Sequence, residues 1–173
     1  EELRSKIGYV SQRAVLFSGS IAENIRYGRE DASDEEVLRA IKTSMAAEFV
    51  LSMPEGLDSV IAQGGTNLSG GQKQRLAIAR ALVRRPLIYV FDDCFSALDF
   101  ITDARLRAAL RKETADSTVI IVAQRVSTVM GADQIIVLDD GRVAGAGSHK
   151  ELLDTCSVYR EIVASQLSLE ELA

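Results

Sequence analysis

Short continuous apolar runs alternate along this chain with longer amphipathic segments. Short apolar runs rich in β-branched residues predict strands at Ile7–Val10 and in the segments LIYVF, TVIIVA and QIIVL. Amphipathic segments predict helices between them, at about residues 20–28, 34–43, 46–51, 71–84, 102–112, 148–154 and 158–166. Continuous apolar strands separated by helices indicate a buried parallel sheet, so the pattern predicts an α/β fold.

Capping and turn residues set the expected ends of these elements. Ser33 with Glu36 predicts a capping box for one helix, and Ser69 is the expected N-cap of the helix that Pro86 ends. Asp140-Gly141 predicts a turn after the last apolar run. The longest apolar runs have the length of strands, so we expect no membrane-spanning helix in these residues.

The composition fits one ordered domain and argues against some partners. The chain has 173 residues, of which 47% are hydrophobic and 26% charged, as in a globular protein with a substantial core. Its net charge of −5 argues against a nucleic-acid-binding surface. Cys94 and Cys156 have neither the spacing of a disulfide framework nor that of a zinc site, so we expect reduced cytosolic thiols.

Two short motifs suggest phosphate and metal chemistry. LIYVFDD places Asp92 and Asp93 at the carboxyl end of an expected strand, where open α/β sheets bind ligands and where a carboxylate suits Mg²⁺. Residues 68–72, LSGGQ, lie at a helix start whose free N–H groups favour an anion. Each motif alone also has a structural explanation, since aspartates can end a strand and glycines often precede helices. Their occurrence together, followed by SALD, favours the chemical interpretation.

In order and spacing these motifs resemble those of the ATP-binding cassette of an ABC transporter, over essentially the whole chain. LSGGQ resembles the ABC signature, LIYVFDD the Walker B strand, SALD the D-loop, and YVSQ the Q-loop. LFSGSIAENIRYG and VLDDGRVAGAGSHKELL resemble exporters rather than importers. The resemblance implies a P-loop NTPase-type parallel sheet with an inserted helical subdomain. That subdomain would span about residues 13–85 and touch a membrane domain, while residues 1–12 and 86–173 would form the rest of a partial nucleotide-binding domain.

The resemblance also implies a site for ATP and Mg²⁺. Asp92 would hold the Mg²⁺ of bound ATP, and Gln12 would reach the same metal and the attacking water. Asp93 would occupy the place of the residue that polarises this water, and Gln124 the place of a residue that contacts the γ-phosphate.

A second cassette would complete each site, because cassettes of this family form head-to-tail dimers around two nucleotides. The signature would contact ATP held by the opposite cassette, and the D-loop would lie at the dimer interface and couple the two sites. The residues concerned are Ser69, Gly70, Gly71 and Gln72 of the signature, and Ser96 and Asp99 of the D-loop.

The chain lacks one motif of the family. The Walker A loop, Gly-x-x-x-x-Gly-Lys-Ser/Thr, cradles the phosphates and neutralises them with its lysine, yet no Gly-Lys pair occurs in the sequence. In the family this loop precedes the Q-loop, so we expect a cassette truncated at its N-terminal side. We therefore expect the isolated chain to bind ATP weakly or not at all and to be inactive as an ATPase; micromolar binding of Mg·ATP in calorimetry would contradict this.

Two substitutions at catalytic positions point to a degenerate site. The family usually has glutamate where Asp93 stands, and a carboxylate shorter by one methylene is drawn back from the water. Exporters usually have histidine where Gln124 stands, and an amide carries no mobile proton. The only histidine, His149, lies in GSHKELL and offers no replacement. The chain thus resembles the degenerate half of a heterodimeric exporter, with neutral drift or a sequence error as the alternative.

Two other classes of ABC-type ATPase fit the sequence poorly, and one non-enzymatic alternative stays open. A DNA-repair ATPase with an ABC-type head needs a long coiled coil between Q-loop and signature, and the spacing here leaves no room for it. A soluble translation-type protein would not have the exporter-like segment LFSGSIAENI. A non-enzymatic fragment or a regulatory or dimerisation module stays open as the alternative to an export ATPase. The export hypothesis places the chain at the cytoplasmic face of a membrane, held there by a transmembrane domain.

Overall fold

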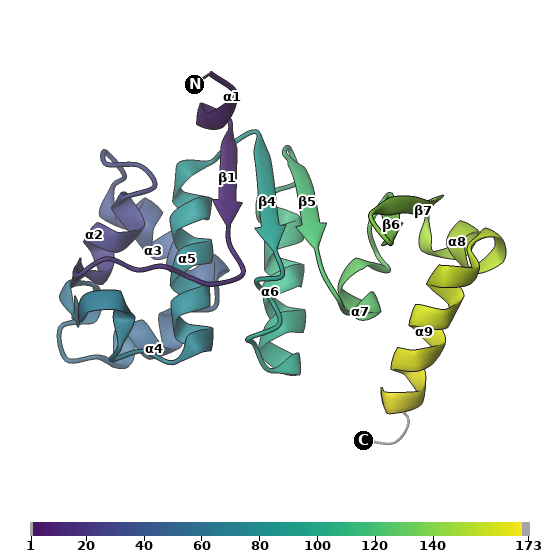
Figure 1. Cartoon of the computed structure of the whole chain (residues 1–173). Coiled ribbons are helices and arrows are strands. Elements are labelled where there is room, and N and C mark those ends of the chain that lie inside the picture. The colour runs from purple at the N-terminus through teal and green to yellow at the C-terminus, as the bar shows by residue number, and fades with distance from the viewer. Residues whose placement is uncertain (1, 171–173) are drawn as a thin grey trace. The chain divides into compact units, whose positions relative to one another are not determined.

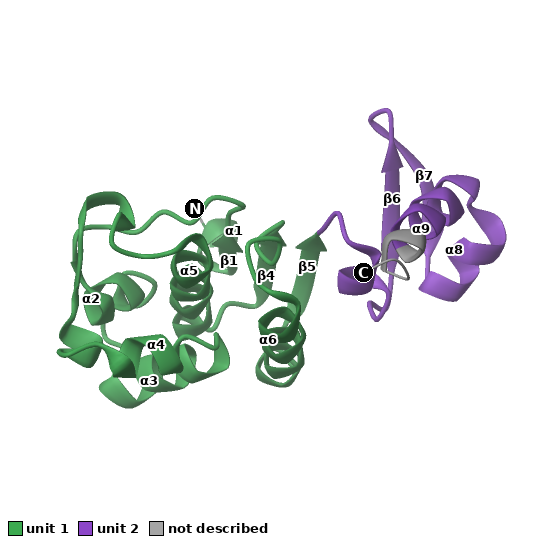
Figure 2. Cartoon of the chain, turned by 90° about the horizontal axis from the view of Figure 1, so that it is seen from below, with its two compact units in different colours: residues 1–122 green, residues 123–173 purple. Residues whose placement is uncertain are grey.

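The computed structural model describes the backbone of residues 2–170 and the side chains of residues 2–166, in two compact units (Figures 1 and 2). One unit ends at Val122 and the other begins at Ala123. The helices and strands of the first unit are α1 (Glu2–Ser5), β1 (Ile7–Val10), β2 (Gly19–Ser20), α2 (Ile21–Arg26), α3 (Asp34–Thr43), α4 (Ala47–Ser52), β3 (Val60–Ile61), α5 (Gly70–Arg84), β4 (Ile88–Asp92), α6 (Phe100–Glu113) and β5 (Thr118–Val122), with two short 3₁₀ turns, η1 (Gly56–Asp58) and η2 (Gln63–Gly65). The second unit contains α7 (Val126–Val129), β6 (Ile135–Asp139), β7 (Arg142–Gly147), α8 (His149–Thr155) and α9 (Ser157–Glu170).

Capping boxes begin four of the helices. In each box a serine hydroxyl accepts a hydrogen bond from the backbone N–H three residues on, and the Glu or Gln at that position accepts from the serine N–H. The expected caps Ser33 and Ser69 are confirmed, and each such cap stabilises its helix by about 1 kcal/mol. The four pairs are Ser20–Glu23, Ser33–Glu36, Ser69–Gln72 and Ser148–Glu151.

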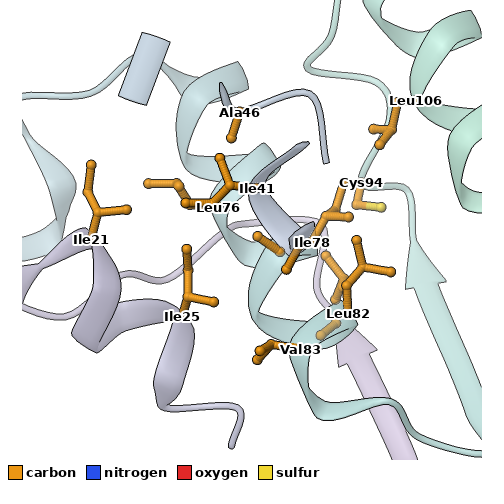
Figure 3. Close-up of a cluster of buried hydrophobic side chains, with 14 of the residues drawn as sticks. Ile21, Ile25, Ile41, Ala46, Leu76, Ile78, Leu82, Val83, Cys94 and Leu106 are labelled. Carbon is orange, nitrogen blue, oxygen red and sulfur yellow. The ribbon is translucent and has the colours of Figure 1, made fainter. Parts of the chain in front are cut away.

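Helix α5 is the central element of the first unit. Figure 3 shows Leu76, Ile78 and Leu82 of α5 among side chains of α2, α3 and α6, and all three are at most 4% exposed. The helix ends at Arg84, and the next residue, Arg85, adopts a left-handed conformation directly before Pro86. Its apolar side chains therefore join the helical layer to the sheet that follows.

A parallel sheet, in the order β1-β4-β5, lies beside α5 (Figure 1). Val10 of β1 pairs with Phe91 of β4, which pairs with Ile121 of β5. Alternate residues of β4, Tyr89 and Phe91, are buried in the same cluster as residues of α5 and α6. The expected α/β fold with a parallel sheet is confirmed.

The expected burial of the sheet on both faces is wrong for β5. Ile120 and Val122 are 49% and 51% exposed, and Tyr9 of β1 is 58% exposed. These residues share the face that points away from Tyr89 and Phe91, and within the described part of the first unit no layer covers that face. A parallel strand is buried on both sides only where helices cover both faces.

The expected place of QIIVL in the parallel sheet is also wrong. This strand, β6, pairs with β7 in an antiparallel hairpin, and the two form a sheet of their own. Asp140 and Gly141 connect them, with φ of +43° and +74°, as the predicted turn requires. A two-residue turn of this kind makes the next strand the antiparallel neighbour, which the apolar pattern of β6 alone does not reveal.

The C-terminal helices follow the expectations. The predicted helices at 148–154 and 158–166 are present as α8 and α9. Cys94 and Cys156 are both buried and free. In residues 2–170 no helix combines the length and the apolar character that crossing a membrane requires.

A buried amide joins α5 to the end of β1, and its loss should destabilise the chain. Gln74 is 2% exposed and its Nε2 donates to the Ser11 carbonyl at 3.0 Å. Replacing Gln74 with leucine leaves that carbonyl without its donor, so Gln74→Leu should lower the free energy of unfolding by about 1–3 kcal/mol. Urea denaturation measures this, with the same change at exposed Gln63 as control. Equal losses for both variants would contradict the role of the bond.

Candidate functional site

The carboxyl ends of β1 and β4 bring Gln12 and Asp93 together. Gln12 Nε2 donates to Asp93 Oδ2 at 3.0 Å, across 81 positions of sequence. Asp93 has a φ of +43°, which is uncommon for a residue with a Cβ, and its N–H donates to the Val122 carbonyl of β5 at 2.8 Å. The backbone therefore turns at Asp93, while its N–H adds one more hydrogen bond to those that join β4 and β5. Two of the residues expected to be catalytic are thus in direct contact.

Asp92, the expected metal ligand, accepts a hydrogen bond that sequence reasoning missed. Tyr9 Oη donates to Asp92 Oδ2 at 2.7 Å. The strand register pairs Tyr9 with Val90, so Tyr9 shares a face with Asp92, two residues further along β4. The hydrogen bond to Asp92, together with desolvation and the carboxylate's charge, raises the pKa of the Tyr9 phenol above its usual value. In the sequence, the alternation of side chains within YVSQ shows only that Tyr9 and Ser11 share one face of the strand. Asp92 can be recognised as the partner of Tyr9 only once the register of β1 against β4 is known.

The signature residues occupy the first turn of α5. Ser69 Oγ accepts from Gln72 N at 3.2 Å, while Gln72 Oε1 accepts from Ser69 N at 2.9 Å. A Cβ added at Gly70 would meet nothing within 4 Å. The α5 N-terminus therefore presents an open backbone surface beside Gly70, where the helix dipole and unpaired N–H groups favour an anion.

The D-loop residues contact both the signature and the strand end. A Cβ at Gly71 would lie 3.2 Å from the Ala97 carbonyl oxygen, so glycine permits the close approach of the two segments. Ser96 Oγ donates to the Asp93 carbonyl at 2.8 Å. Asp99 caps α6 by accepting from Thr102 N, and the hydrogen bonds from Thr102 lower the pKa of the Asp99 carboxyl. The two expected interface residues thus have local hydrogen-bonding roles as well.

An arginine unnoticed in the sequence holds the signature helix from the side. Arg75 Nη1 donates to the Met45 carbonyl at 2.7 Å, and its Nε donates to the Gly71 carbonyl at 3.3 Å. Its guanidinium lies 4.9 Å from the centre of the Phe49 ring. Burial lowers the pKa of this arginine, although the group keeps its charge at neutral pH. Arg75 thereby ties the start of α5 to the neighbouring helix α4.

Gln124, the remaining expected catalytic residue, belongs to the second unit. Its carbonyl accepts from Gln166 Nε2 at 2.7 Å. In the same unit His149 Nδ1 lies 2.7 Å from Tyr159 Oη. The first unit thus brings Gln12, Asp92, Asp93 and the D-loop together, and links them to the signature through Gly71.

The carboxylates at the end of β4 suit a metal cation that needs few ligands from the protein. Among the described residues, no three His, Cys, Asp or Glu side chains lie close enough together to hold a metal ion unaided. Mg²⁺ is commonly held by one or two carboxylates with the rest of its shell from water and phosphate. The neighbouring carboxylates of Asp92 and Asp93 at the sheet edge fit that pattern.

The family model described as ABC transporter matches residues 1–96. The chain belongs to the ABC transporter family. An uncharacterized ABC transporter ATP-binding protein of Mycobacterium tuberculosis H37Rv is 51% identical over 169 residues, which are 96% of this chain and 29% of that protein. A second uncharacterized ABC transporter ATP-binding protein, from Bacillus subtilis strain 168, is 48% identical over 170 residues, covering 98% of this chain and 29% of the relative.

Two further matches also cover more than nine tenths of this chain. The human mitochondrial potassium channel ATP-binding subunit is 48% identical over 160 residues, which are 92% of this chain and 22% of that protein. A solved structure of a bacterial Atm1-family ABC exporter with ATP bound superposes with a TM-score of 0.92 at 44% identity. That match covers 95% of this chain and 29% of the exporter chain. This ABC chain therefore spans less than a third of the relatives it matches.

The contact between Tyr9 and Asp92 predicts a linked titration. Asp92→Ala should lower the pKa of the Tyr9 phenol towards its ordinary value, because both the acceptor and the negative charge disappear. A pH titration of the tyrosine ring signals by NMR measures this, with Tyr9→Phe to identify the signal. Asp116→Ala, at an exposed aspartate before β5, is the matched control and should change nothing. An unchanged Tyr9 titration in Asp92→Ala would contradict the contact.

Proposed function

We propose that this chain is part of the nucleotide-binding domain of an ABC exporter. It would couple the binding and hydrolysis of ATP, at a dimer of cassettes, to transport across a membrane. The observation that carries the proposal is the 3.0 Å hydrogen bond between Gln12 and Asp93 beside Asp92, at the carboxyl edge of a parallel sheet. The similarity to an Atm1-family exporter supports the export direction.

The residues at the carboxyl edge of the sheet would divide the binding of Mg·ATP and the positioning of the attacking water among them. Asp92 and Gln12 would hold Mg²⁺, which supplies charge neutralisation at the phosphates when bound. Asp93 would accept a hydrogen bond from the attacking water, and Gln12 would keep that carboxylate turned towards it. Tyr9 would hold the second carboxylate, that of Asp92, in one orientation through its 2.7 Å hydrogen bond.

The chain's own site would be slow. Asp93 is one methylene shorter than the glutamate usual in the family, and a displacement of about 1 Å can cost about 10²-fold in rate. Gln124 replaces the usual histidine with an amide that exchanges no proton. This site would mainly retain ATP, while the signature residues Ser69–Gln72 complete the faster site of a different partner cassette.

The partners would be a second cassette and a transmembrane domain. Residues 13–85 would form the helical part that contacts the membrane domain, and residues 1–12 and 86–173 would belong to the catalytic core. In this arrangement the chain works at the cytoplasmic face of the membrane.

Restoring the usual catalytic residues should raise ATP hydrolysis. In the subunit that contains this chain, assembled with its partner, Asp93→Glu combined with Gln124→His should increase the ATPase rate at this site by tenfold up to about 10²-fold. The chemically matched control is Asp116→Glu combined with Gln134→His, at two exposed positions. Steady-state phosphate release measures the rates. An assembled dimer that binds ATP but gains nothing from the restoring pair would contradict the degenerate site, and a wild-type dimer without ATPase activity would favour a non-enzymatic module.

Adding a methyl group at the signature should separate stability from function. Gly70→Ala should leave the chain's free energy of unfolding unchanged or raise it by about 0.4–1 kcal/mol, because the new Cβ meets no atom within 4 Å. In the assembled dimer it should lower ATP hydrolysis at the partner's site, since the methyl fills the space proposed for the phosphate. Thermal unfolding and phosphate release give the two readouts. Full activity in Gly70→Ala would contradict the role of the signature.

A further inference from the structure

The segment between β5 and β6 contains Gln124 and leads into the four-residue helix α7. Helix α7 has no cap of its own, because the Arg125 side chain at its N-cap position makes no capping hydrogen bond. The first N–H groups of a helix need partners from outside the helix. Here the partner of Val126 N comes from a distant part of the chain, the C-terminal helix α9.

Gln166 of α9 brackets this segment with both ends of its side-chain amide. Its Oε1 accepts from Val126 N at 2.7 Å, and its Nε2 donates to the Gln124 carbonyl at 2.7 Å. Glutamine is suited to this because one planar group carries both a donor and an acceptor. Two short bonds on either side of Arg125 fix the path of the backbone at Gln124.

Helix α9, which carries Gln166, is anchored in the core of the second unit. Tyr159 and Val163 of α9 are 3% and 8% exposed in the core of the second unit, and Tyr159 Oη also contacts His149 Nδ1. Positions 159, 163 and 166 follow the spacing of one helix face. The side chains of α9 that fill the core of this unit lie on the same helix face as Gln166 and therefore also position it; the unit is purple in Figure 2.

We propose that Gln166 is a positioning residue for the nucleotide site: it holds the backbone of Gln124 and so directs the Gln124 side chain to the γ-phosphate. This inference rests on the proposed function, in which Gln124 occupies the phosphate-contacting position. Through Gln166, the C-terminal helix determines how firmly the chain's own site retains ATP.

The first experiment tests the bracket on the chain itself, independently of nucleotide. In Gln166→Ala the Val126 amide should exchange with solvent three- to tenfold faster, about the effect of losing one neutral hydrogen bond. NMR hydrogen exchange measures this, with Gln134→Ala as the matched control. An unchanged Val126 amide, or equal acceleration throughout β6 and β7, would overturn the inference, since the second result means a general structural role.

The second experiment tests the effect on nucleotide in the assembled dimer. The slow phase of radiolabelled ATP release should be three- to tenfold faster in Gln166→Ala, with the KM for ATP at the partner's site unchanged. Gln166→Glu keeps the acceptor for Val126 but loses the donor to Gln124, so it should release ATP faster while Val126 stays protected.

The outcomes separate this inference from the proposed function. A slow phase in the wild type that both variants leave unchanged overturns the positioning role and leaves the proposed function intact. A wild type without any slow phase contradicts the proposed ATP-retaining site, and the inference falls with it even where Val126 exchange responds as expected.

Discussion

The burial of α5 is the constraint on which the candidate site depends. The first turn of this helix carries the signature, and the chain passes from its end through Pro86 into the strand that leads to Asp92 and Asp93. Its middle is packed against α2 and α3 and donates through Gln74 to the residue directly before Gln12. One buried helix thus sets the positions of the Q-loop residue, the signature and the strand end together.

Polar side chains of this helix donate to backbone carbonyls in partly buried positions. Gln74 donates to the Ser11 carbonyl and Arg75 to the Met45 carbonyl. Such bonds add little net stability but cost much when lost, because the remaining partner stays desolvated. They hold the backbone of the segments that surround the end of β4, where Asp92 and Asp93 lie.

Local features of the fold were predictable from the sequence and non-local ones were not. Ser33 and Ser69 were recognisable as caps because the partner of each lies three residues away. Strand β6 was misplaced because its apolar pattern does not reveal which strand it pairs with, and the short turn at Asp140-Gly141 decides that. The resemblance to ABC cassettes supplied Gln12, Asp92 and Asp93, but the contact of Tyr9 with Asp92 depends on the register of β1 against β4. The Gln166 bracket joins residues 40 and 42 positions apart, and no periodicity signals it.

The central claim is that the signature of this chain serves a nucleotide held by another cassette. The most direct measurement is the structure of the assembled dimer trapped with Mg·ATP, read for the distances from Ser69 Oγ and the Gly70 backbone N–H to the γ-phosphate. The account predicts hydrogen-bonding distances to the ATP held by the partner cassette, with Asp92 and Gln12 beside the Mg²⁺ of the other nucleotide. Signature residues that face solvent or a transmembrane helix, with both nucleotides remote from Ser69 and Gly70, would contradict it.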